Sequence, residues 1–141
     1  DAVMNVNLKG TFICAQIASV QMMSQKFGRI VNTSSIGSLG NIGQANYAAS
    51  KAGVIGLTKT LSLEWARFNI TVNCVAPGAT KTKMTAGMPE NVLQSVLEKI
   101  PLRRMAEPDE IASAHLFFVS DDASYVTGQV LFVDGGITVG I

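Results

Sequence analysis

The sequence has few of the side chains that build disulfide frameworks, metal centres or catalytic triads, because its 141 residues include two cysteines and one histidine. Cys14 and Cys74 lie in separate apolar stretches, and neither belongs to a Cys-x-x-Cys pair. We therefore predict that both are buried thiols of a protein in a reducing compartment. His115 lies in an apolar helical stretch with no acid or nucleophile at a suitable spacing. We expect neither a triad nor a zinc site, and no other metal.

The sequence also lacks an excess of one charge and a long apolar run. Eleven Lys and Arg against ten Asp and Glu give a net charge of +1, and like charges are not clustered. Nothing would attract a phosphate backbone or an anionic membrane surface at long range, so we expect no nucleic acid and no membrane partner. No apolar run approaches the ~20 residues that span a bilayer, and residues 1–4 do not resemble a signal peptide. We predict a soluble, cytoplasmic protein.

Composition and periodicity predict one α/β domain, or part of one. The apolar fraction of 48% is high for a monomer, which favours a covered sheet, helices that associate, or both. Helical periodicity covers residues 2–25, 47–68, 91–100 and 108–119. Short apolar, β-branched runs predict strands over residues 29–33, 70–75 and 129–133. Because a helical crossover joins parallel strands, we expect a parallel sheet with helices on its faces.

Polar residues follow two of the predicted strands. Ser34 and Ser35 come directly after the first strand. Pro77 and Gly78 follow the second, and Tyr47 begins the helix between them. Ligands of parallel α/β sheets bind at the carboxyl ends of the strands, so these residues should meet at one edge. Each feature alone is common at strand ends and turns, and their meeting at one edge favours a functional site.

Tyr47 and Lys51, four residues apart, share one face of the predicted helix. A phenol is a poor proton carrier at neutral pH, but a neighbouring ammonium group favours its phenolate form. A serine hydroxyl at the same edge would hold a carbonyl or alcohol oxygen while Tyr47 gives or takes its proton. None of these groups supplies a hydride, so redox chemistry here requires a bound cofactor. Asn7, about one and a half turns into the first helix, lies within reach of this edge.

Three glycines lie between the first strand and the helix that begins at Tyr47, where a dinucleotide fingerprint would bind a pyrophosphate. Gly37, Gly40 and Gly43 recur at every third residue, which differs from the spacing Gly-x-Gly-x-x-Gly. The second strand is followed by Ala76 and Pro77 instead of an acid for a ribose hydroxyl. We predict a flexible active-site loop and not a phosphate cradle.

Ordered motifs across essentially the whole chain resemble the short-chain dehydrogenase/reductase family. The matching segments are residues 6–8, 28–35, 47–53, 73–78, and 127–129 with 133–136. The resemblance implies a Rossmann-like, doubly wound parallel sheet with helices on both faces. Two features of the family do not occur here: the glycine-rich turn for the adenine-side pyrophosphate and the residue that selects NAD or NADP. We therefore expect residues 1–141 to be a single partial domain, the carboxyl-terminal catalytic part, with the amino-terminal nucleotide-binding half missing.

The resemblance implies a role for each matching residue. Tyr47 would be the general acid/base, Lys51 would assist it and hold the nicotinamide ribose, and Asn7 would anchor a water in a proton relay. The segment from Pro77 to Thr82 is similar to the family's contact with the nicotinamide carboxamide. The cofactor, NADP or NAD, would therefore contact Tyr47, Lys51, Pro77, Gly78, Thr80 and Thr82.

The catalytic serine can be counted in two ways. Three residues on from Asn32 is Ser35, whereas the family's usual thirteen-residue step back from Tyr47 gives Ser34. We predict Ser35, because strand register fixes the direction of a side chain while loops absorb deletions.

The resemblance implies an NAD(P)-dependent oxidoreductase that moves a hydride between nicotinamide and a carbonyl or secondary alcohol of a small molecule. Residues 40–47 are most similar to 3-oxoacyl-acyl-carrier-protein reductases, which would take an acyl thioester. Sugar, polyol and cyclic alcohol dehydrogenases share the scaffold and stay as alternatives. Residues 81–90 would form a mobile substrate loop.

The resemblance also implies that subunits assemble. The family pairs its two long helices across subunits, and the small residues Ala49, Gly53 and Gly56 suit a homo-tetramer or homo-dimer. From another functional class, the alternative is a non-catalytic truncated fragment that acts only in assembly.

Overall fold

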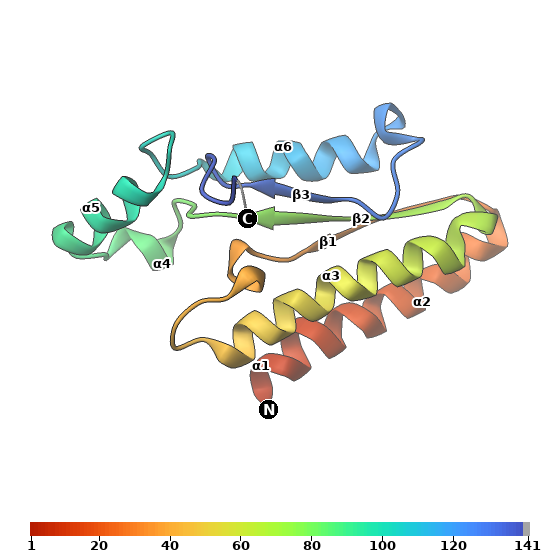
Figure 1. The fold of residues 1–141 in the computed structure, drawn as a ribbon. Coiled ribbons are helices and arrows are strands. Elements are labelled where there is room, and N and C mark those ends of the chain that lie inside the picture. Colours follow the sequence, from red (N-terminus) through yellow and green to blue (C-terminus); the bar gives the residue numbers. More distant parts are fainter. Residues whose placement is uncertain (140–141) are drawn as a thin grey trace.

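The computed structural model describes residues 1–139 and contains one parallel sheet (Figure 1). Its strands are β1 (Gly28–Thr33), β2 (Ile70–Pro77) and β3 (Val130–Val133), in the spatial order β1-β2-β3. The register pairs Gly28 with Ile70 and Cys74 with Val130. Because all three strands run in the same direction, their carboxyl ends lie at one edge of the sheet.

Helices cover both faces of this sheet, which confirms the predicted doubly wound α/β architecture. Figure 1 shows α2 (Gly10–Gln25) and α3 (Ala45–Trp65) on one side of the strands and α6 (Pro108–Val119) on the other. The central strand β2 is buried from residue 70 to residue 76, as expected for an apolar, β-branched strand covered on both faces. The α3 side of the core includes Leu61, Trp65, Ile70 and Val72, and the α6 side includes Val75, Phe118 and Ala123.

The predicted helix over residues 2–25 is confirmed as a continuous helical segment, but it contains a wider turn. It consists of α1 (Ala2–Met4), the π-helical turn η1 (Asn5–Lys9) and α2. The N–H of Gly10 donates to the carbonyl of Asn5 across this turn, and the Thr11 hydroxyl donates to the carbonyl of Asn7 at 2.7 Å. π turns inside helices are frequent at functional sites, and this one includes Asn7.

The remaining elements are short. They are η2 (Ile36–Leu39), η3 (Ala66–Phe68), α4 (Lys83–Ala86), α5 (Glu90–Lys99) and η4 (Asp121–Ala123). The predicted end of the second strand at residue 75 was wrong, because β2 continues through Pro77. The last residue pair between β1 and β2 is Thr33 with Val75, and Pro77 lies beyond it. Proline has no N–H to donate, but no residue of β1 is paired with this position, so no hydrogen bond between the strands is lost. Among residues 1–139, no helix combines the length and apolar character needed to cross a bilayer.

The prediction that both cysteines are buried was wrong for one of them. Cys74 is fully buried in β2, whereas Cys14 is exposed on α2. The reason is that α2 buries only Ala15 and Ser19, so the neighbouring position 14 lies outside the packed stripe of the helix. The thiol of Cys74 is taken out of water, and this burial raises its pKa.

Candidate active site

A cleft of about 600 Å³ opens at the carboxyl ends of β1 and β2. Its lining includes five of the residues predicted from the sequence, which come from three separate parts of the chain: Ser35, Tyr47, Gly78, Thr80 and Thr82. The residues of η2 and of the loop before α3 complete one wall, and Met84 and Thr85 of α4 lie on another. The structure therefore brings the end of β1, the start of α3 and the segment after β2 to one site, at the edge where parallel α/β sheets bind ligands.

Tyr47 and Lys51 lie one turn apart on α3. The Lys51 ammonium nitrogen is 5.8 Å from the centre of the Tyr47 ring, and it donates to the main-chain carbonyl of Thr33 at 3.0 Å. Both side chains are half-buried. The hydrogen bond ties Lys51 to the last residue of β1, so the ammonium group is held beside the tyrosine by the sheet and not by the helix alone.

The two serines after β1 have different environments. Ser34 is 3% exposed, and its hydroxyl donates to the main-chain carbonyl of Lys51 at 2.8 Å. Ser35 is half-buried, lines the cleft, and accepts a hydrogen bond from the N–H of Gly37 at 3.0 Å. Ser34 therefore links the end of β1 to α3, while Ser35 is the serine that lines the cleft.

Gly37 lies next to both Ser35 and Tyr47 in the cleft. A Cβ atom at this position would be 3.0 Å from Cε1 of Tyr47 and 3.4 Å from Oγ of Ser35. The glycine is needed here for space, because a side chain would push against the tyrosine ring. The sequence pattern identified the glycine-containing loop but not this contact.

Asn7 does not line the cleft that contains Tyr47. Its side-chain amide donates to the Ser50 hydroxyl at 3.2 Å, and Ser50 donates to the carbonyl of Tyr47 at 2.7 Å. Asn7 and Lys51 instead line a neighbouring cavity of about 540 Å³ beside β1. The sequence analysis missed Ser50. The available signal was a serine between Tyr47 and Lys51, because a serine inside a helix often hydrogen-bonds to a carbonyl of the preceding turn.

The segment that follows β2 provides the opposite wall of the cleft. Pro77 ends the strand and does not line the cleft, whereas Gly78 does. The N–H of Gly78 donates to the carbonyl of Val133 at 2.9 Å, and a Cβ at Gly78 would be 2.8 Å from atoms of Asp134. The Thr80 hydroxyl donates to the carbonyl of Gly78 at 3.1 Å. The contacts of Gly78 with Val133 and Asp134 at the end of β3 therefore fix the position of this wall of the cleft.

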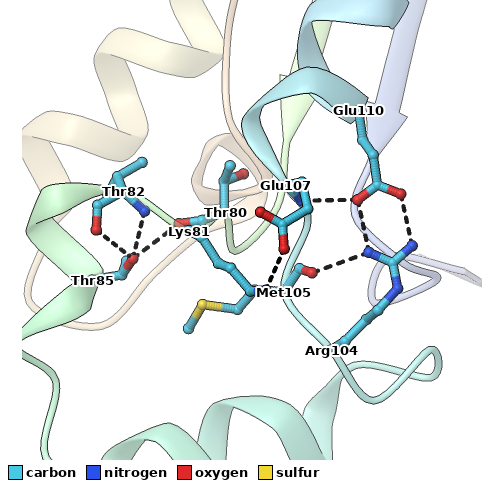
Figure 2. Close-up of polar contacts among 8 residues, drawn as sticks. All are labelled: Thr80, Lys81, Thr82, Thr85, Arg104, Met105, Glu107 and Glu110. Atoms are coloured by element: carbon cyan, nitrogen blue, oxygen red, sulfur yellow. Dashed lines mark hydrogen bonds and ion pairs between the residues drawn. The ribbon is translucent and has the colours of Figure 1, made fainter.

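Beyond the end of β2, Thr80 and Ala106 form an isolated parallel bridge, which brings together the two ends of the segment between them. We call this bridge and the ion pairs beside it the neck (Figure 2). Lys81 pairs with Glu107, and Arg104 makes two hydrogen bonds of 2.7 Å to the carboxylate of Glu110. These bonds from Arg104, with a further bond from the Glu107 N–H, lower the pKa of Glu110 to about 2.

The neck was not predicted from the sequence, which gave residues 81–90 as a loop. That stretch contains α4 and the first residue of α5. The available signal was the Glu at 107 followed three residues later by Glu110, a capping box at the start of an apolar helix. The mobility of the segment stays a prediction.

The lone histidine lies outside the cleft lining. The Nδ1 atom of His115 is 3.0 Å from the carbonyl of Ile111, and Nε2 is 2.9 Å from the hydroxyl of Thr33. Since a carbonyl only accepts, Nδ1 is the donor in its contact with Ile111. Within residues 1–139, no cluster of three or more His, Cys, Asp or Glu side chains is arranged to hold a metal ion.

The similarity of the chain to known proteins shows its family. A family model described as Enoyl-(Acyl carrier protein) reductase matches residues 1–138. The chain belongs to the short-chain dehydrogenase/reductase family. It is 54% identical over 140 residues to the 3-oxoacyl-(acyl-carrier-protein) reductase FabG of Thermotoga maritima. It is 52% identical over 136 residues to the acetoacetyl-CoA reductase of an Acinetobacter species.

The fold agrees with a solved structure of the same family. The chain matches a crystal structure of gluconate 5-dehydrogenase from Burkholderia cenocepacia in complex with NADP and tartrate, with a TM-score of 0.94 and 36% identity. That match covers 99% of this chain and 56% of the other. The two curated relatives are covered to 57% and 55% of their length by 99% and 96% of this chain. The chain therefore spans a little over half the length of its relatives.

Proposed function

We propose that the protein containing this chain reduces a carbonyl group to a secondary alcohol with NADPH or NADH. The observation that carries this proposal is the meeting of Ser35 and Tyr47 in one cleft, with Lys51 held one turn from the tyrosine. A hydroxyl donor, a proton donor and a fixed cation are the groups that a carbonyl oxygen needs as negative charge develops on it.

Each of these residues has a distinct part in the proposed reaction. A reduced nicotinamide, when bound, would supply the hydride for the carbonyl carbon. Ser35 donates a hydrogen bond to the carbonyl oxygen, and Tyr47 gives that oxygen its proton, which leaves the alcohol. The Lys51 ammonium group stabilises the phenolate that Tyr47 becomes. Asn7 is assigned to the return of a proton from solvent, because it lines the same cavity as Lys51 and is linked to α3 through Ser50.

The residues around the cleft fit a dinucleotide with a ribose diol and a carboxamide. An ammonium group has three N–H donors, and among residues 1–139 the structure gives one of those of Lys51 a protein acceptor, the carbonyl of Thr33. Two donors are thus available for a diol. We assign the cofactor to four residues that line the cleft and to two that lie next to them in the chain. The first four are Tyr47, Gly78, Thr80 and Thr82, and the other two are Lys51, one turn from Tyr47, and Pro77, which precedes Gly78.

We infer that the substrate is a 3-oxoacyl thioester. Two relatives at 54% and 52% identity are named as 3-oxoacyl and acetoacetyl reductases, whereas the gluconate dehydrogenase is 36% identical. The gluconate relative makes oxidation of a sugar acid the second candidate. Fold and catalytic residues do not separate the two candidates, because one scaffold serves many substrates.

We also infer that copies of the protein associate through the outer face of α2 and α3. Large apolar side chains are exposed there, among them Ile17 at 68%, Val20 at 71% and Leu63 at 81%. An apolar surface of this kind favours a partner surface of the same chemistry, and a homo-dimer or homo-tetramer supplies it.

Turnover by the intact protein tests the proposed function. NADPH and NADH consumption is measured with a 3-oxobutanoyl thioester, and NADP⁺ and NAD⁺ reduction with gluconate. We expect rapid consumption of one reduced cofactor with the thioester and little activity with gluconate. Activity with gluconate alone would show that the substrate is a sugar acid and not a thioester. No activity with either substrate would contradict the proposed function.

A further inference from the structure

Ser34 makes a buried hydrogen bond that the proposed reaction does not use. Its side chain is 3% exposed, and its hydroxyl donates to the main-chain carbonyl of Lys51 at 2.8 Å. The direction follows the alternation of side chains along a strand, because Asn32, two residues earlier, also points toward α3 and donates to the Thr58 hydroxyl at 2.9 Å. Ser34 therefore joins the carboxyl end of β1 to α3 at the position of Lys51.

The end of β1 holds Lys51 at two points. The ammonium nitrogen of Lys51 donates to the carbonyl of Thr33, and its main-chain carbonyl accepts from Ser34. This strand end is itself fixed, since the N–H of Ser34 donates to the carbonyl of Val75 in β2 at 2.8 Å. On the other side of the sheet, where Figure 1 shows α6, the Thr33 hydroxyl lies 2.9 Å from Nε2 of His115. Both contacts of Lys51 are thus made to residues that the sheet and α6 hold in place.

The two hydroxyl groups of the proposed reaction lie at opposite ends of this link. Ser35 is the residue after Ser34, and Tyr47 lies one turn before Lys51 on α3. The covalent path from Ser35 to Tyr47 runs through residues 36–46, so the hydrogen bond from Ser34 to Lys51 is a much shorter route than the chain. The bond connects the segment that carries Ser35 directly to the helix that carries Tyr47.

We propose that Ser34 is a positioning residue, whose hydrogen bond to Lys51 sets the position of Tyr47 relative to Ser35. The inference rests on the proposed function. A hydroxyl has one proton to donate, and Ser34 gives it to Lys51, whereas Ser35 lines the cleft. Ser34 therefore acts through Lys51 and not on the substrate. Because small displacements of a reacting group are costly, loss of this bond slows the reaction although every reacting group is still present.

The experiment measures the single-turnover rate of the intact protein, loaded with its reduced cofactor and mixed with a 3-oxobutanoyl N-acetylcysteamine thioester. We expect Ser34→Ala to lower this rate by about tenfold, and Ser35→Ala by about 100-fold or more. The affinity of Ser34→Ala for the reduced cofactor should be nearly unchanged, because Lys51 keeps its bond to Thr33. Ser34→Thr, which keeps the hydroxyl group, should recover most of the rate.

Ser62→Ala is the matched control. Ser62 lies on the same helix, is 4% exposed, and its hydroxyl donates to the carbonyl of Lys59 at 2.7 Å. Ser62→Ala and Ser34→Ala each lose one hydrogen bond from a buried serine to a helix carbonyl, so both should lower the midpoint of urea unfolding to a similar extent. Only Ser34→Ala should also slow the single turnover, which separates positioning from stability.

Three results would overturn this inference while the proposed function stands. They are a single-turnover rate in Ser34→Ala equal to that of Ser62→Ala, a folded Ser34→Thr as slow as Ser34→Ala, and a loss in Ser34→Ala as large as that in Ser35→Ala. In the last case Ser34 would be the serine that contacts the substrate. Failure of the wild-type protein to turn over either the thioester or gluconate would overturn the proposed function, and with it the inference.

Discussion

Gly37 sets how closely the tyrosine and serine of the candidate site approach each other. A methyl group at this position would be 3.0 Å from the Tyr47 ring. We expect Gly37→Ala to lower kcat by about tenfold or more, because small displacements of a reacting group are costly, while the free energy of unfolding changes by about 1 kcal/mol. Steady-state kinetics and urea unfolding measure the two effects. A folded variant with wild-type kcat would contradict the assigned contact.

The two cysteines should differ in reactivity because they differ in burial. The thiolate is the reactive form, and burial raises the pKa of the Cys74 thiol, whereas Cys14 is exposed. We predict that iodoacetamide at pH 8 modifies Cys14 much faster than Cys74, and that Cys74 reacts only after unfolding. Mass spectrometry of peptides at successive times measures both rates. Equal rates in the native protein would contradict the burial of Cys74.

At the scale of single elements, α3 contains two glycines with opposite surroundings. A Cβ at Gly56 meets nothing within 4 Å, whereas one at Gly53 would be 2.8 Å from Cδ2 of Leu8. We predict that Gly56→Ala raises the free energy of unfolding by about 0.5–1 kcal/mol through helix propensity. Gly53→Ala should raise the free energy of unfolding by less, because the Leu8 side chain must move to make room for the methyl group. Urea unfolding of both variants tests this pair, and a larger gain for Gly53→Ala would contradict the packing of α3 against η1.

One carboxyl group of the neck, that of Glu110, has an unusually low pKa. The pKa of Glu110 falls from an ordinary 4.5 to about 2, mainly through its hydrogen bonds from Arg104. A carboxyl group with a lowered pKa in the folded state stabilises the fold fully above about pH 4.5, and this contribution is lost as the pH falls toward 2. NMR titration of the side-chain carboxyl carbons should give Glu110 a midpoint near 2, and Arg104→Met should return it toward 4.5. A wild-type midpoint near 4.5 would contradict the ion pair.

Elements that depend on local sequence were predicted, whereas those that depend on contacts between separate segments were not. Periodicity located α6 at residues 108–119 and the two long helices, because their apolar spacing is local information. The π turn around Asn7 and the Thr80–Ala106 bridge were missed, since both depend on contacts between segments. The choice of Ser35 over Ser34 as the catalytic serine came from strand register, and it stays a prediction. The structure places Ser35 in the cleft lining and bonds the Ser34 hydroxyl to the carbonyl of Lys51. The exposure of Cys14 could not be predicted, because it depends on which stripe of α2 meets β1.

For the whole molecule, we propose that copies associate through the apolar outer face of α2 and α3. Ile17 and Leu63 are 68% and 81% exposed on neighbouring helices. We predict that Ile17→Glu and Leu63→Glu each shift the intact protein toward smaller species, because a charge at an apolar interface loses its hydration without a partner. Sedimentation velocity measures the shift, and Ile42→Glu, on the loop before α3, is the control. Unchanged association in both variants would contradict the proposed interface.

The proposed reaction depends on Tyr47 acting as the proton donor to an oxygen in the cleft that it shares with Ser35. The most direct measurement is the turnover of Tyr47→Phe in the intact protein, together with its affinity for the reduced cofactor. We predict a loss in kcat of about 100- to 10,000-fold with cofactor affinity nearly unchanged, because the substitution removes one hydroxyl group and keeps the ring. Wild-type turnover in the folded variant would contradict the account.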